Sequence, residues 1–188
     1  VDPDRVPSDA IVETTTFTTR GVPRVPSGGR VIEVTKDDNL EALEKNMQPG
    51  DTYLLHAGDY GDWTIGNNIE TDDNPLLRGT RDKPIRIQKF GDGDVNFNSI
   101  EIHGDYFWFH DVKVGAGGIR GDNDHWPVGV TLTKVSSKGA YYTIHGEGYE
   151  WNALDFDIGG VEGGDITKEG IQWALGTRGH VGAFGKIA

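Results

Sequence analysis

The sequence contains no cysteine among its 188 residues. This absence excludes disulfides and thiolate metal sites, and it favours a bacterial origin. The chain also lacks an apolar run near the about 20 residues that cross a bilayer, and it has no basic amphipathic segment. We therefore expect no membrane partner. The chain begins at Val1 with neither a Met nor an apolar leader, which fits a mature extracellular protein or a trimmed chain.

Basic residues are scarce, because 18 Lys and Arg stand against 30 Asp and Glu and give a net charge of −12 at pH 7. This charge repels nucleic acid phosphates, and no Lys/Arg cluster offsets it locally, so nucleic acid is not expected as a partner. The charge also repels uronic-acid polymers unless Ca²⁺ bridges the carboxylates or a local basic column compensates.

Several catalytic motifs are missing as well. The chain has no Gly-x-Ser-x-Gly elbow, no phosphate-binding loop, no His-Glu-x-x-His helix and no dinucleotide fingerprint. Serine-type hydrolases, nucleotide enzymes and helical zinc proteases are therefore disfavoured.

Glycine is abundant instead, with 28 residues, and hydrophobic residues reach only 35%. The single long helical pattern is confined to residues 37–47, with Asp37 or Asp38 expected as its N-cap, so the class should be all-β. Residues 1–29 hold four prolines and read as a lead-in arm with one strand, and residues 30–188 form the expected domain.

Short β-rich runs separated by Gly, Asp and Asn turns fill the domain. The expected strands are Val31–Val34, Thr52–His56, Trp63–Ile65, Pro84–Phe90, Val95–Phe97, Ser99–His103, Tyr106–Val114, Val128–Val135, Tyr141–His145, Trp151–Ile158 and Ile171–Leu175. Such runs also fit a sandwich or a barrel. An approximate repeat favours a solenoid, because the Ile-His-Gly segment at 102–104 recurs at 144–146, about two periods of roughly 21 residues later.

Three blocks then carry a family resemblance over residues 31–114. The first block covers residues 31–60, with the helical segment Asn39–Leu43 and the segment Pro49–Tyr60, and the other two are Gly79–Ile87 and Ile100–Phe109. This order resembles the opening of the alginate lyase and chondroitinase B family of secreted polysaccharide lyases. The resemblance implies a right-handed parallel β-helix, a pectate-lyase-like solenoid with a short N-terminal capping helix. It also implies a Lys and an Arg about one coil apart and a Ca²⁺ held by acidic and amide side chains.

A regular repeat would align three charged residues. Lys113, Lys134 and Asp155 are each 21 residues apart, so they would form one outward column. Adjacent cations lower one another's pKa, so one Lys could abstract the proton next to a uronate carboxyl group while the other stabilises the developing charge. Lys113 and Lys134 are thus the candidate catalytic residues, and an ordinary solvated surface is the alternative.

Two loops supply candidate ligand-binding residues. Asp122, Asn123 and Asp124 crowd one turn with oxygen ligands and are the candidate Ca²⁺ site, with plain turn chemistry as the alternative. Flat aromatic rings with polar rims suit sugar stacking. The candidate substrate-binding residues are Trp126, Tyr141, Tyr142 and His145.

The sequence predicts two alternative functions. The first is an extracellular lyase-like enzyme that cleaves a uronic-acid polysaccharide by β-elimination, and the second is a non-catalytic glycan-binding or structural module. The segment at 176–185 has no capping helix, so an open solenoid end would need a second copy of the chain, a folded-over segment or further sequence to cover it.

Overall fold

The computed structural model describes residues 24–66, 79–121 and 127–138 and four later strands, β11 (Tyr142–Gly146), β12 (Asn152–Gly159), β13 (Glu169–Trp173) and β14 (Gly182–Ile187). The earlier strands are β1 (Val31–Val34), β2 (Thr52–Leu55), β3 (Gly58–Asp59), β4 (Asp62–Ile65), β5 (Ile85–Lys89), β6 (Val95–Ile102), β7 (Phe107–His110), β8 (Lys113–Gly121), β9 (Thr131–Thr133) and β10 (Ser136–Lys138). One short helix, α1 (Leu40–Glu44), lies between β1 and β2.

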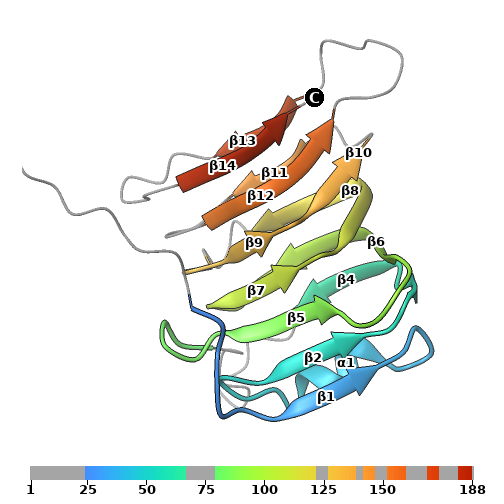
Figure 1. Ribbon diagram of the computed structural model, residues 1–188, viewed down its shortest axis with the longest axis vertical. Helices are drawn as coiled ribbons and strands as arrows, with labels where there is room; N and C mark the ends of the chain where they lie inside the picture. The colour runs from blue at the N-terminus through green and yellow to red at the C-terminus, as the bar shows by residue number, and fades with distance from the viewer. Residues whose placement is uncertain are drawn as a thin grey trace, which may run out of the picture.

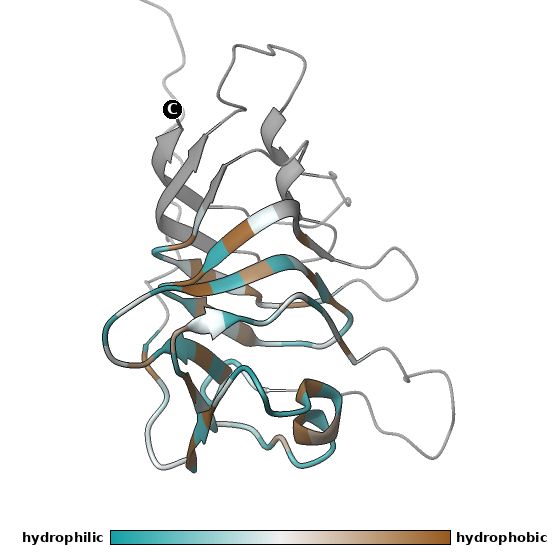
Figure 2. Cartoon of the chain, turned by 90° about the vertical axis from the view of Figure 1, so that its right-hand side faces the viewer, coloured by the Kyte–Doolittle hydropathy of each residue, from teal (hydrophilic) through white to brown (hydrophobic). Residues whose placement is uncertain are grey.

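The described strands pair in parallel and form two layers (Figure 1). One layer runs in the order β1, β2, β5, β7 and β9, and the other in the order β4, β6, β8, β11 and β13. Apolar side chains from both layers meet in one core, where the Trp63 ring on β4 lies edge-on to Phe109 of β7 at 6.3 Å between centroids. The alternation of apolar and polar residues along the described strands is visible in Figure 2. Buried residues alternate with more exposed ones along β2, β4 and most of β6, as expected for a period of two residues.

The predicted right-handed parallel β-helix is wrong. Regular coils would separate neighbouring Cα partners by a constant number of residues, but the separation is 21 from Ile32 to Tyr53, 34 from Tyr53 to Ile87 and 22 from Ile87 to Phe109. Hydrogen bonding also joins both layers into one 14-stranded network, because β10 pairs with β8 of one layer and with β12, which pairs with β9 of the other. What the structure supports is parallel sheets with little helix.

The expected helix is present, but its cap differs from the prediction. Asn39 is the N-cap, and its side chain accepts a hydrogen bond from the Ala42 amide at 3.0 Å. Asp38 instead accepts from the amide and hydroxyl of Thr35 at 2.7 and 2.8 Å, which closes the turn before the helix. Asn39 therefore caps the helix and Asp38 closes the preceding turn, so the N-cap lies one residue after the predicted Asp38.

The last residue of α1 ties the helix to the sheet. One oxygen of the Glu44 carboxylate accepts from Trp63 Nε1 at 2.7 Å and the other from the Gly66 amide at 2.9 Å. Burial raises the pKa of Glu44, and these two bonds oppose the shift. Leu40 and Leu43 pack against the core from the same helix. The helix thus covers core residues beside the first strands.

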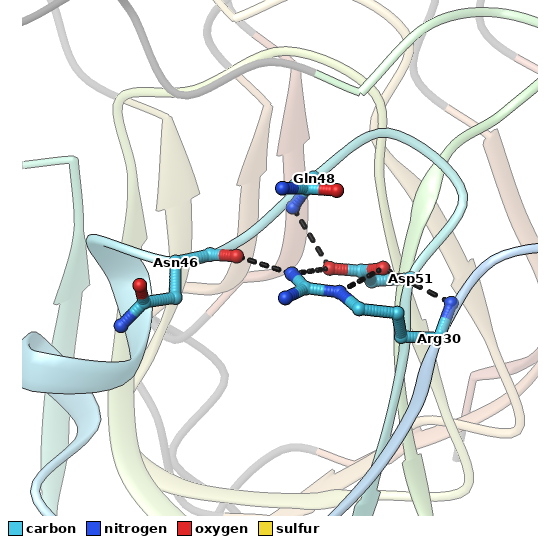
Figure 3. A network of polar contacts seen from close by, with 4 residues as sticks. All are labelled: Arg30, Asn46, Gln48 and Asp51. Carbon is cyan, nitrogen blue, oxygen red and sulfur yellow. Dashed lines mark hydrogen bonds and ion pairs between the residues drawn. The ribbon is translucent and has the colours of Figure 1, made fainter.

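A polar network holds the entry into β1 against the start of β2 (Figure 3). The Asp51 carboxylate is 1% exposed and accepts from Arg30 Nε at 3.1 Å and from the Gln48 amide at 2.8 Å. Arg30 also donates from its backbone amide to Asp51 at 3.2 Å and from its guanidinium to the Asn46 carbonyl oxygen. Buried carboxylate oxygens are thereby matched to donors, as a buried charge requires.

Two glycines with almost the same backbone conformation give a matched stability test. Gly129 has φ +72° and faces the Tyr106 ring, so an added Cβ would lie 2.3 Å from Tyr106 Cδ1, whereas Gly61 has φ +70° and open space around it. Gly61→Ala should cost about 1 to 2 kcal/mol, the strain of a left-handed residue. Gly129→Ala should cost a further 1 to 3 kcal/mol or so from overpacking. Urea unfolding measures both, and equal losses would contradict the clash.

Candidate functional site

The predicted lysine column does not form. Lys113, at the start of β8, has Asn96 and Ser136 as its Cα partners in the neighbouring strands. Its Nζ lies 2.7 Å from the Asp94 carboxylate. Lys134 is exposed in the turn between β9 and β10 and has a left-handed backbone with φ 53°. The two lysines therefore occupy different rows and are not direct neighbours.

The residue that aligns with Lys134 is Asp111. It has φ 55° in the matching turn after β7, and its amide donates to the Thr133 carbonyl oxygen, directly before Lys134. Lys89 of β5 follows on the other side, with Nζ 2.9 Å from the Asp111 carboxylate. Charges of opposite sign thus alternate along these turns. The neighbour of Lys134 along this row is therefore an acidic residue and not Lys113.

Most of the predicted binding residues lie outside the described residues. These are Trp126 and Tyr141, proposed to contact sugars, and Asp122, Asn123 and Asp124, proposed to hold Ca²⁺. Within the described ranges, no group of three or more His, Cys, Asp or Glu side chains could hold a metal ion.

Tyr142 and His145 lie on β11, where the structure gives their backbone positions. The register corrects the repeat that the Ile-His-Gly segments indicated. His145 pairs with Arg120 of β8, and Arg120 pairs with Glu101 of β6, so the row of His145 leads to Glu101 and not to His103. The similarity of the two segments is therefore not a structural repeat.

A different site lies on the face of β5 that points away from the core. Ile85 and Ile87 are fully buried core residues, as their alternation predicts, while Arg86 between them is not part of the core cluster. Arg86 is nevertheless only 7% exposed. Burial lowers the pKa of Arg86, because the guanidinium loses contact with water. Its Nε is buried and donates to no acceptor among the described residues.

The cover over Arg86 comes in part from Trp108, its Cα partner on β7. The guanidinium carbon lies 4.7 Å from the centre of the indole ring, a cation–π geometry. Trp108 is 4% exposed, and it lies on the opposite face of β7 from the core residues Phe107 and Phe109. Trp108 is therefore buried on the outer face of the sheet and lies outside the core cluster.

A row of partly exposed polar side chains runs beside this pair. Gln88, His110 and Thr133 are Cα partners in successive strands β5, β7 and β9. The Thr133 hydroxyl accepts from Trp108 Nε1 at 2.7 Å and contacts His110 Nδ1 at 2.7 Å. Indole N–H only donates, so these contacts fix the tilt of the Trp108 ring over Arg86. The row supplies both donors and acceptors at the edge of the buried cation.

This arrangement, which we call the Arg86 site (Arg86, Trp108, Gln88, His110 and Thr133), is chemically suited to an anion with hydroxyl groups. A guanidinium presents a planar fork of donors that matches a carboxylate in two parallel hydrogen bonds. Amide, imidazole and hydroxyl groups bind sugar hydroxyls.

Sequence reasoning missed the site because a polar residue on the outer side of a strand is ordinarily solvated. The one available signal was the spacing of 22 residues between Arg86 and Trp108, which the register confirms as a cross-strand pair. The assumed period of about 21 residues aligned other residues instead.

Comparisons with protein-family models, with curated proteins and with solved structures found no match. The resemblance to polysaccharide lyases therefore stays a prediction of the sequence. In the part of the chain that the structure describes, no helix is long and apolar enough to cross a membrane.

Proposed function

We propose that this protein binds an acidic polysaccharide and that a uronate carboxylate contacts Arg86. One observation carries the proposal: Arg86 is 7% exposed, and its guanidinium has no carboxylate partner among the described residues. The chain holds 30 Asp and Glu residues, so a counterion within the fold would be easy to supply. A buried charge without a partner is costly, and an anionic ligand would offset that cost.

The surroundings of Arg86 favour a sugar acid over a simple ion. Gln88, His110 and Thr133 follow one another at the spacing of adjacent strands, about 4.8 Å, and all three are partly exposed. A ladder of hydrogen-bonding groups of this kind suits an extended chain of hydroxyl-bearing units. Secretion, which such a ligand requires of a bacterial protein, stays a prediction of the sequence.

Titration calorimetry tests the proposal with one oligosaccharide in two forms, the uronate and its carboxyl-reduced, neutral counterpart. Hydrogen bonds to a charged group contribute about 1.5 to 3 kcal/mol, so the uronate should bind roughly 10- to 150-fold more tightly. Equal affinity for the two forms would show that the carboxylate does not contribute to binding. If neither form gives a heat of binding while the protein is folded, the proposal as a whole is contradicted.

β-Elimination is the second candidate function, and the position of His110 next to the Arg86–Trp108 pair favours it. In that reaction Arg86 would neutralise the carboxylate, a base would take the adjacent proton, and a carbon–carbon double bond would form as the glycosidic oxygen leaves and is protonated. The unsaturated product absorbs ultraviolet light. Constant absorbance with a glycan that binds would leave binding as the function.

A further inference from the structure

We infer that the Arg86 site takes a single uronate unit flanked by neutral sugars and discriminates against consecutive uronate units. The inference rests on the proposed function and names the class of ligand more narrowly. It follows from what surrounds the cation on its own face of the sheet and from the charge of the whole chain.

The positions nearest to Arg86 on its face are all uncharged. Across the strands its Cα partners are Thr52 on β2 and Trp108 on β7. Along the chain, Gln88 is the residue of like parity within β5, and Pro84 directly precedes the strand. A second carboxylate about one sugar away would therefore meet a hydroxyl, an indole, a proline ring or an amide in place of a cation.

The next cation along β5 is already engaged. Lys89 lies at the end of the strand with its Nζ 2.9 Å from the Asp111 carboxylate. An additional ligand carboxylate would have to compete with Asp111 for it and would be repelled by the same group. The described surface around Arg86 thus offers one unpaired buried cation and no second one in contact with it.

The net charge of −12 then acts on every carboxylate that the site does not neutralise. For a protein of this size at low ionic strength, repulsion should weaken binding on the order of tenfold for each uncompensated ligand charge. Salt removes this long-range repulsion, while the short-range contact with a buried guanidinium is screened much less. Affinity for a densely charged glycan should therefore rise with salt, the reverse of what a basic patch gives.

The experiment compares two trisaccharides of equal length, one with a central uronate between neutral sugars and one with three uronates. Calorimetric titrations of the full chain are run with a chelator at salt concentrations of about 0.01 M and 1 M, between which the Debye length falls from about 30 Å to about 3 Å. Arg86→Met serves as the variant that removes the site. Arg24→Met makes the same substitution at an exposed position before β1.

We expect the singly charged trisaccharide to bind roughly a hundredfold more tightly than the triply charged one at low salt, because two extra carboxylates are each repelled. At high salt the two affinities should converge to within about threefold, mainly because the triply charged ligand gains affinity. Arg24→Met should behave like the wild-type chain, and Arg86→Met should bind both ligands roughly 30-fold or more weakly.

The outcomes separate this inference from the function on which it rests. Tighter binding of the triply charged trisaccharide at low salt, with affinity that falls as salt is added, would overturn the single-uronate inference and leave acidic-glycan binding standing. No binding of either ligand at either salt concentration, with the protein folded, would instead remove the proposed function. Binding by Arg86→Met equal to that of Arg24→Met would place the ligand elsewhere and overturn the inference.

Discussion

Arg86→Met is expected to lose uronate binding and at the same time to make the protein more stable. Removing one partner of a buried charge pair costs about 2 to 5 kcal/mol of binding, so affinity should fall roughly 30-fold or more. In the free protein the substitution removes a buried donor without an acceptor, worth about 1 to 3 kcal/mol, and sacrifices a cation–π contact worth about 0.5 to 2 kcal/mol. The net gain in the free energy of unfolding should be about 1 kcal/mol, or a rise in Tm of about 2 to 4 °C.

The opposite signs of the two effects are what distinguish a binding residue from a structural one. Met keeps the length and apolar packing of the side chain over Trp108, so cavity formation does not confuse the result. Arg24→Met, at an exposed position, should change neither Tm nor affinity. A lower Tm in Arg86→Met would mean that the guanidinium stabilises the fold through its contact with Trp108, and the site would then lose its main support.

Asp51→Asn should be one of the most damaging substitutions that conserves size. The carboxylate is 1% exposed and accepts from the Gln48 amide as well as from Arg30 (Figure 3). An amide in its place offers one oxygen and turns an N–H group toward donors, so at least one buried donor loses its acceptor. The expected loss in the free energy of unfolding at neutral pH is about 2 to 3 kcal/mol. Urea unfolding measures it, with Asp37→Asn, whose side chain is 83% exposed, as the matched control.

The effect of Asp51 should depend on pH with a definite sign. Burial by itself raises the pKa of Asp51, but the bonds from Arg30 and from the Gln48 amide outweigh it and hold the pKa below the ordinary Asp value. A carboxyl group with a lowered folded-state pKa contributes stability above its unfolded-state pKa, and this contribution is lost as pH falls through the lowered value. The difference between wild type and Asp51→Asn should therefore shrink in acid. A difference that is constant across this range would contradict the ion pair.

The positions of many strands could be predicted from local pattern. In β5 the alternation of Ile85 and Ile87 with Arg86 and Gln88 places the apolar residues in the core. Val31–Val34 was located to the residue, because a short β-prone run between turn residues is a local signal. The pattern predicts one strand over Tyr106–Val114, but the structure has two strands there, β7 and β8, with Asp111 in a left-handed turn between them. Asp is enriched at positive φ, but a single Asp inside a β-prone run does not by itself predict such a turn.

The register between strands could not be predicted, and the candidate site depended on it. The connection between Tyr53 and its partner Ile87 is longer than that between Ile87 and Phe109. The local sequence does not show how many residues of a connection lie in a loop outside the sheet. A register error of two residues is enough to place Lys113 next to Lys134, at the position that Asp111 occupies in the structure. The predicted pair of lysines thus resulted from assuming a constant repeat length. The same assumption did not pair Arg86 with Trp108, so the buried cation was missed.

The most direct measurement of the central claim follows the Nε–H group of Arg86 itself by proton–nitrogen NMR during titration with a uronate trisaccharide. Because this Nε is buried, its signal should exchange slowly with water, and the spectrum of Arg86→Met assigns it by its loss. We predict that the uronate moves this signal in proportion to occupancy, whereas the carboxyl-reduced trisaccharide leaves it in place. A signal that stays fixed while the uronate binds elsewhere on the protein would contradict the assignment of Arg86 as the carboxylate partner.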